Sequence, residues 1–349
     1  MDEESITALS LDSTVGSHPI AAETVRLDPE GDATFILSGS ECPQEYLVSS
    51  KVLSLASPVF SKLFGPNFKE GQEIRRGDHP RISLEDDDPK AMGLILSILH
   101  HKSSQVPLKM EPEALATLAI HCDKYDCNEA LRPWAAGWCS NSEDVNAVED
   151  LGFMLLAAYM FRSPAFSATA SRAARRLKPN FASVWGEHET LTLLPETITD
   201  ALSDQIAEGL KKLHELLQST EVKLRFQGAC YTMDGLTCSR CGRTLPGEAK
   251  KCHPCYNTDL LTRTCTSDYR VAEYFATLTR YELWPSLGPF ATCGLSDIRD
   301  RMECLHDQRH LCGAGDRCPL IGQLKLMSTG AEVVLKNVKG ISLEEIIVV

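Results

Sequence analysis

Long apolar runs are missing from this 349-residue chain, and their absence limits what the chain can be. No stretch approaches the ~18 consecutive apolar residues that a membrane-spanning helix requires, so no membrane partner is predicted. The first sixteen residues, MDEESITALSLDSTVG, have neither the basic region nor the apolar region of a secretory signal peptide. We therefore expect a cytoplasmic or nuclear protein.

Catalytic motifs are missing as well. The sequence contains no nucleophile elbow, no Walker loop and no protein-kinase set. No residue is therefore predicted to be catalytic or to bind a small-molecule cofactor, and we predict that the chain is not an enzyme. With 43% hydrophobic and 24% charged residues it has the composition of ordinary globular protein, and its length suits two or three domains.

The whole chain has a formal net charge of −13, and positive charge is scarce in its first part. Residues 221–349 hold 16 Lys+Arg against 15 Asp+Glu, whereas the first 220 residues hold 19 against 33. An acidic surface repels the phosphate backbone of nucleic acids. Nucleic acid is therefore not the expected partner of the first part.

The most informative stretch is residues 46–70, because it predicts a pair of short helices. Apolar residues recur there at spacings of three and four, as on one face of a helix: Val52, Leu53, Ala56, Val59, Phe60 and Leu63. Ser57-Pro58 interrupts this face, and a proline favours the first position of a new helix. The pattern therefore indicates two helices joined at Ser57, the first of them opening at Ser49 or Ser50.

This stretch resembles the signature of the BTB/POZ interaction domain, a Leu-x-x-x-Ser-x-x-Phe pattern followed by a hydrophobic-x-Glu motif. The matching residues are Leu53, Ser57, Phe60 and Phe68-Lys69-Glu70, while Ser49 and Ser50 replace the family's His-Lys pair. The resemblance covers residues 28–139. It implies a homodimer, partner-binding roles for Asp32, Phe68 and Glu70, and for the last two a contact with a cullin-type ubiquitin-ligase scaffold.

The remaining patterns predict an α+β fold for residues 28–139, with a small sheet and a cluster of helices. Residues 1–27 are acidic, aperiodic and rich in Ser and Thr, so we expect a disordered arm. The β-branched or alternating segments 33–37, 46–48 and 81–84 are expected to be strands. Helices are expected to open at Asp88-Pro89, at Pro112 and at Asn128.

The rest of the chain divides into a helical extension at 140–220 and a Cys-rich domain at 221–349. Helices are predicted at 143–160, 164–177 and 195–218, the last with near-heptad apolar spacing that we interpret as packing rather than as a coiled coil. In the Cys-rich domain we expect helices at 271–283 and after Ser296. Its end, residues 330–349, is rich in Val and Ile and is expected to add strands.

Ten of the fourteen cysteines lie after residue 220, and the clearest of them are Cys238, Cys241, Cys252 and Cys255. They form two Cys-x-x-Cys pairs separated by ten residues, a spacing that lets four thiolates reach one tetrahedral zinc. Gly242 suits the tight turn that follows such a pair. Without a secretory signal, clustered cysteines more often bind metal than form disulfides, so we predict a structural zinc. Neither a redox dithiol nor a RING-type site fits the surrounding sequence.

A second, weaker candidate for a metal site lies further along the chain. Its possible ligands are Cys304, His306, His310, Cys312 and Cys318. Thiolates and neutral imidazoles at such density can bind a second zinc, although exposed histidines at a helix end would give the same pattern.

These observations favour a protein–protein interaction module, a homodimeric BTB-type scaffold that presents its C-terminal region to protein clients. Two alternatives remain open. One is a substrate adaptor of a cullin ubiquitin ligase, suggested by Phe68 and Glu70. The other is a transcription-type regulator whose zinc-stabilised tail touches nucleic acid, suggested by the 8 basic and 4 acidic residues within 223–270. A steep dependence of DNA affinity on salt would distinguish the regulator.

Overall fold

The fold comes from a computed structural model, which describes residues 24–38, 43–102, 104, 106–140, 145–307, 310 and 312–347. The described chain divides into two compact units, with the boundary between Val106 and Pro107. Small sheets and many helices make the fold α+β, as predicted. No helix in the described ranges combines the length and apolar character needed to cross a bilayer.

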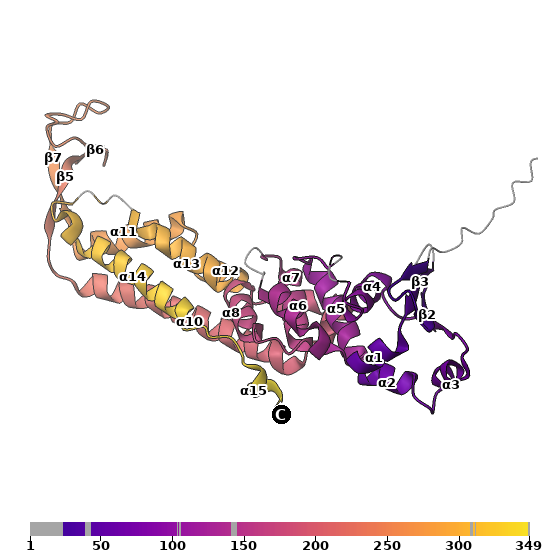
Figure 1. Cartoon of the computed structure of the whole chain (residues 1–349). Coiled ribbons are helices and arrows are strands. Elements are labelled where there is room, and N and C mark those ends of the chain that lie inside the picture. The colour runs from indigo at the N-terminus through magenta and orange to yellow at the C-terminus, as the bar shows by residue number, and fades with distance from the viewer. Residues whose placement is uncertain are drawn as a thin grey trace, which may run out of the picture. The chain divides into compact units, whose positions relative to one another are not determined.

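In its described residues the first unit combines a four-stranded sheet with the helices α1 to α4 (Figure 1). Its elements are β1 (Thr24–Arg26), β2 (Ala33–Leu37), β3 (Gln44–Val48), α1 (Ser50–Ala56), α2 (Pro58–Leu63), α3 (Lys69–Arg76), β4 (Arg81–Leu84) and α4 (Pro89–Leu99). The strand order is β1-β3-β2-β4, so β1 and β4 form the two edges. Strand β2 is antiparallel to β3 and parallel to β4. The three predicted strands are therefore confirmed.

The helical hairpin predicted around Ser57 is present. Ser57 has an extended backbone, as a residue before proline prefers, and it ends α1. Its Oγ accepts a hydrogen bond from the backbone N–H of Phe60 at 3.0 Å and so caps α2. Phe60 is buried against Phe35 of β2, with ring centroids 5.6 Å apart. The bend at Ser57 therefore places an aromatic anchor of α2 in the core under the sheet.

The second unit contains the remaining helices and a three-stranded sheet. Its helices are α5 (Pro112–Lys124), α6 (Asn128–Ser140), α7 (Val148–Met160), α8 (Phe166–Arg176), α9 (Phe181–Trp185), α10 (Glu196–Phe226), α11 (Ser267–Arg280), α12 (Leu287–Thr292), α13 (Leu295–Glu303), α14 (Pro319–Lys336) and α15 (Leu343–Ile347), with short 3-10 turns at Glu189–Leu193, Cys304–Asp307 and Gly315–Arg317. Its strands are β5 (Tyr231–Cys238), β6 (Thr244–Leu245) and β7 (Leu260–Cys265).

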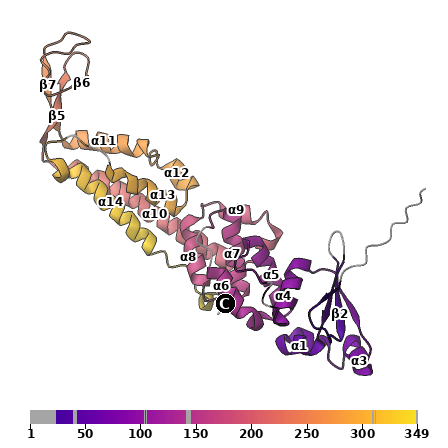
Figure 2. The same ribbon diagram turned by 45° about the horizontal axis from the view of Figure 1, so that its top comes forward.

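Helix α10 is the longest element of the second unit, and α11, α13 and α14 pack along it (Figures 1 and 2). Its near-heptad apolar residues are buried in this packing, as the sequence predicts: Ile198, Leu202, Ile206, Leu210, Leu213 and Leu217. Both views show β5, β6 and β7 extending from one end of this helical layer. Strand β5 is central and antiparallel to both neighbours.

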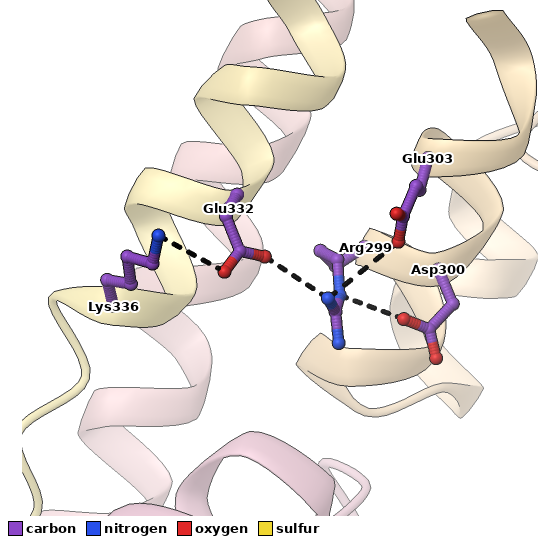
Figure 3. Close-up of polar contacts among 5 residues, drawn as sticks. All are labelled: Arg299, Asp300, Glu303, Glu332 and Lys336. Carbon is purple, nitrogen blue, oxygen red and sulfur yellow. Dashed lines mark hydrogen bonds and ion pairs between the residues drawn. The ribbon is translucent and has the colours of Figure 1, made fainter.

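An ion-pair network joins α13 to α14 (Figure 3). The guanidinium of Arg299 on α13 lies 3.1 Å from a carboxylate oxygen of Glu332 on α14 and 2.8 Å from one of Asp300. Glu332 also pairs with Lys336 one turn later at 3.6 Å. Because Arg299 is partly buried, this pairing fixes the two helices side by side more firmly than an exposed pair would.

The structure departs from the sequence prediction in several places, of which the C-terminal end is the largest. Residues 330–349 were expected to be strands, but α14 runs to Lys336 and α15 follows it, because Leu320, Leu324, Met327, Ala331 and Leu335 repeat at helical spacing and are buried. Gly294 rather than Ser296 precedes α13. The predicted N-terminal arm lies outside the described residues up to residue 23, and Thr24–Arg26 form β1.

Candidate metal centres and partner-binding residues

The two Cys-x-x-Cys pairs converge at one end of the three-stranded sheet. Cys238 ends β5, and Cys241 follows in the turn to β6. Cys252 and Cys255 lie in the loop between β6 and β7, and the four sulfur atoms all lie within 4.8 Å of one another. The structure therefore brings together all four residues of the first predicted site, which we call the first centre.

The distances between the sulfurs match a tetrahedral metal site. The Sγ of Cys238 lies 3.4 Å from that of Cys255, and Cys241 lies 3.5 Å from Cys252 and 3.7 Å from Cys255. Four sulfurs at ~2.3 Å from a central zinc would be separated by about 3.8 Å. Every described cysteine is a free thiol, so no disulfide occupies these ligands.

The backbone turns of the first centre repeat one another. Gly242, directly after Cys241, has a φ of 69°, and Tyr256, directly after Cys255, has a φ of 54°. In each Cys-x-x-Cys pair, the residue after the second cysteine therefore has a left-handed backbone conformation, which reverses the direction of the chain. The N–H of Cys238 donates to the carbonyl of Arg243 at 3.0 Å, and in the same way the N–H of Cys252 donates to that of Asn257 at 2.8 Å. The N–H of Gly242 also donates to the carbonyl of Cys238 at 2.9 Å. The tight turn expected at Gly242 is therefore present.

Hydrogen bonds lower the pKa of one thiol of the first centre. Burial raises the pKa of the Cys238 thiol, but the Asn257 amide and the backbone N–H groups of Arg240 and Cys241 outweigh it and lower the pKa to about 6. Burial and the neighbouring thiols instead raise the pKa of Cys252 to about 12. Four thiolates this close repel one another strongly, so full ionisation requires a cation among them. The first centre can hold a metal ion.

A second group of ligands lies at the opposite end of β5 and β7. Its members are Cys265, His310, Cys312 and Cys318, whose ligand atoms also lie within 4.8 Å of one another. Cys265 ends β7 and pairs in register with Tyr231 at the start of β5, whereas Cys238 pairs with Leu260. The two groups are thus separated by the length of the strand pair, roughly 20 Å at ~3.3 Å per residue.

The second group differs from the predicted one in its ligands. His310, Cys312 and Cys318 belong to it, as the sequence suggests, but Cys265 joins them and Cys304 does not. Cys304 is exposed at the start of a 3-10 turn, and the side chain of His306 lies outside the described part of the structure. Cys265 precedes His310 by 45 residues, so its proximity follows from the sheet rather than from any local spacing in the sequence.

The predicted partner-binding residues all lie in the first unit, Asp32 directly before β2 and Phe68 and Glu70 at the start of α3. Both carboxylate oxygens of Asp32 accept hydrogen bonds from Ser50, one from its backbone N–H at 2.7 Å and one from its hydroxyl at 2.6 Å. Asp32 therefore helps to fix the start of α1. Phe68 directly precedes α3 and is 48% exposed, and Glu70 lies in the first turn of that helix.

Four of the eight basic residues within 223–270 lie next to the cysteines of the first centre in the sequence, and all four are exposed: Arg240, Arg243, Lys250 and Lys251. Lys251 places its ammonium 5.7 Å from the centre of the Tyr256 ring. This contact is a cation–π pair at the rim of the centre.

Comparison with known proteins bears on the first part of the chain. The model of the BTB/POZ domain family matches residues 32–135, which include the sheet from β2 onward, the hairpin at Ser57 and helices up to α6. No curated protein gives a significant match to the chain. Residues 32–135 of this chain are a BTB/POZ domain.

Proposed function

We propose that this chain is a non-catalytic adaptor that forms a homodimer through its BTB/POZ domain and presents its C-terminal region to protein clients. The observation that carries the proposal is the BTB/POZ domain at residues 32–135, because domains of this family are protein-interaction modules that self-associate. The free thiols of the described cysteines suit the reducing cytosol or nucleus, in which we place the protein.

The dimer interface that we propose is formed by α1 and the edge strand β1. Leu55 on α1 is 82% exposed, although its neighbour Leu53 is fully buried. Among the described residues strand β1 pairs with β3 alone, so its other side is an open sheet edge in that part of the chain. A two-fold interface would cover both features on each protomer at once.

Co-precipitation of two differently tagged full-length copies from the same cells tests self-association. We expect each tag to recover the other. A full-length Leu55→Asp variant should lose this recovery, because a charge would be buried in the interface. Leu326→Asp should keep it, because Leu326 is an exposed leucine of α14, far along the chain from the proposed interface. Failure of the unaltered copies to recover one another would contradict the homodimer.

We propose zinc as the metal of the first centre and a structural role for it. Four sulfur ligands at tetrahedral separations leave no open coordination position for a substrate. The ion would therefore stabilise the sheet that carries the C-terminal surface. Replacement of Cys241 by serine should remove one zinc per chain in metal analysis of the purified protein. An unchanged zinc content would exclude this ligand set.

A second candidate function is that of a cullin adaptor, and the exposure of Phe68 favours it. An aromatic side chain that is 48% exposed next to the start of α3 is available to anchor a partner, with Glu70 beside it. Phe68→Ala should abolish co-precipitation of a cullin scaffold, and Leu108→Ala, which alters another exposed apolar residue, should not. The absence of cullin from precipitates of the intact protein would end this candidate.

A further inference from the structure

The second group of ligands combines three buried cysteines with one histidine. Cys265 and Cys318 are fully buried and Cys312 nearly so, while His310 is partly buried. The Nε2 of His310 lies 3.4 Å from the Sγ of Cys265, so this nitrogen faces the sulfurs. Three sulfurs and one imidazole nitrogen are a ligand set typical of structural zinc.

The four ligands come from separate segments that the metal would join. Cys265 ends β7, and Cys312 forms an isolated bridge with Met233 of β5. Cys318 directly precedes α14, where the backbone N–H groups of Leu320 and Ile321 point at its sulfur. One ion at this position would therefore link the end of the sheet that contains Cys265 to the start of α14.

A buried arginine lies beside this group. Arg270, near the start of α11, is fully buried. Within the described ranges it forms no ion pair with a carboxylate. Its Nη1 lies 3.7 Å from the Sγ of Cys265 and donates to the carbonyl of the same residue at 3.0 Å. It also donates to the carbonyl of Ala229 at 2.9 Å. A buried guanidinium without a counter-charge is costly, so a negative group nearby is expected.

A metal-loaded second group supplies that negative charge. Three thiolates and a neutral imidazole around Zn²⁺ leave a net charge of about −1, which one guanidinium balances. We propose that Cys265, His310, Cys312 and Cys318 bind a second zinc ion and that Arg270 is the counter-charge that stabilises it. Arg270 does not touch the metal in this arrangement; it acts through the sulfur of Cys265 as a positioning residue.

Metal analysis of the full-length protein tests the ligand set. We expect about two zinc ions per chain in the unaltered protein and one in Cys318→Ser. The matched control is Cys304→Ser, which alters an exposed cysteine outside the group and should keep two. Loss of a zinc in Cys304→Ser, or two zinc ions in Cys318→Ser, would overturn the assignment.

Cobalt replacement gives a readout that needs no variant, in case a cysteine variant fails to fold. The d–d absorption of Co²⁺ distinguishes four sulfur ligands from three sulfurs and one nitrogen. We expect the unaltered chain to show both spectra at two equivalents of cobalt. A four-sulfur spectrum alone would overturn the second zinc and leave the proposed zinc of the first centre intact. A mixed-ligand spectrum alone would contradict the zinc of the first centre and leave this proposal standing.

The role of Arg270 is tested by metal retention against a competing chelator. Arg270→Gln should weaken cobalt binding at the mixed-ligand centre about tenfold or more, as changes next to metal ligands generally do. The four-sulfur centre should be unchanged, and Arg270→Lys should restore part of the loss because it restores the charge. Arg280→Gln, at the exposed end of the same helix, is the control and should change neither. Equal retention in Arg270→Gln and the unaltered chain would overturn the counter-charge.

Discussion

At the scale of single residues, a few side chains and one glycine determine where the chain turns. Ser57 was predicted to separate two helices because a serine followed by proline suits the boundary, and its hydroxyl caps α2 in the structure. Gly242 was predicted in the turn of the first centre and has a left-handed backbone there. Both predictions depend on the backbone preferences of a residue and its neighbours, which can be derived directly from the sequence.

The cap at Ser57 should be measurable. Ser57→Ala removes a buried acceptor and is expected to lower the stability of the α1–α2 hairpin by about 1 kcal/mol. Ser49→Ala should cost less, because the N–H of Val52 lies 3.5 Å from the Ser49 hydroxyl, at the limit of a hydrogen bond. Hydrogen exchange of the α1 and α2 amides in the full chain measures both. Equal protection in the two variants would refute the unequal roles of these caps.

The turn at Gly242 should also respond to substitution. A Cβ at this position meets no other atom within 4 Å, so Gly242→Ala tests backbone strain alone. We expect a loss of about 1–2 kcal/mol, seen as weaker zinc retention at the first centre. Gly322→Ala is the matched control, because it also has free space but lies inside α14 with ordinary helical φ. It should stabilise the chain by about 1 kcal/mol. Unchanged zinc retention in Gly242→Ala would contradict the strain.

At the scale of elements, prediction succeeded for helix α10 and failed for strand β5 and for the end of helix α14. Helix α10 was predicted because its apolar residues repeat over many turns. Strand β5 was not predicted, because Tyr231–Cys238 lacks a clear alternation and contains Gly235 at a positive φ. The prediction of C-terminal strands was wrong because it relied on β-branched residues such as Val333 and Val334. The buried residues Leu320 and Leu324 show that the segment instead follows the spacing of a helix.

The packing of α14 gives a prediction with an internal control. Leu324 is fully buried and Leu326 is 62% exposed, and both lie on this helix. Leu324→Ala should lower the free energy of unfolding by about 2–5 kcal/mol, because it leaves a cavity beside α10. Leu326→Ala should change it by less than about 0.5 kcal/mol. Urea unfolding followed by far-UV circular dichroism measures the difference, and similar midpoints for the two variants would contradict the packing.

At the scale of the whole molecule, the chain combines an interaction domain with a C-terminal region that has two groups of candidate metal ligands. The family resemblance was predictable from Leu53, Ser57 and Phe60, since the domain's signature is local in sequence. The full membership of the second group of ligands was not predictable, because Cys265 joins it only through the pairing of β5 with β7. Contacts between residues so far apart in the sequence depend on the tertiary structure, which cannot be derived from a single sequence.

Removal of metal should act on one part of the molecule. A strong chelator is expected to speed tryptic cleavage after the basic residues around β5–β7, because the sheet should unfold locally without the two proposed ions. Peptides from the first unit should stay protected, since its core contains none of the proposed ligands. Limited proteolysis with mass spectrometry checks this. Equal cleavage in both parts, or none, would show that metal does not stabilise the sheet locally.

The central claim, that this chain is a homodimeric interaction module, is tested most directly by analytical ultracentrifugation of the full-length, metal-loaded protein at micromolar concentrations. The account predicts a species with twice the 38.4 kDa mass of one chain. Leu55→Asp should sediment as a folded monomer and Leu326→Asp as a dimer. A single-chain mass for the unaltered protein throughout the concentration range would contradict the account.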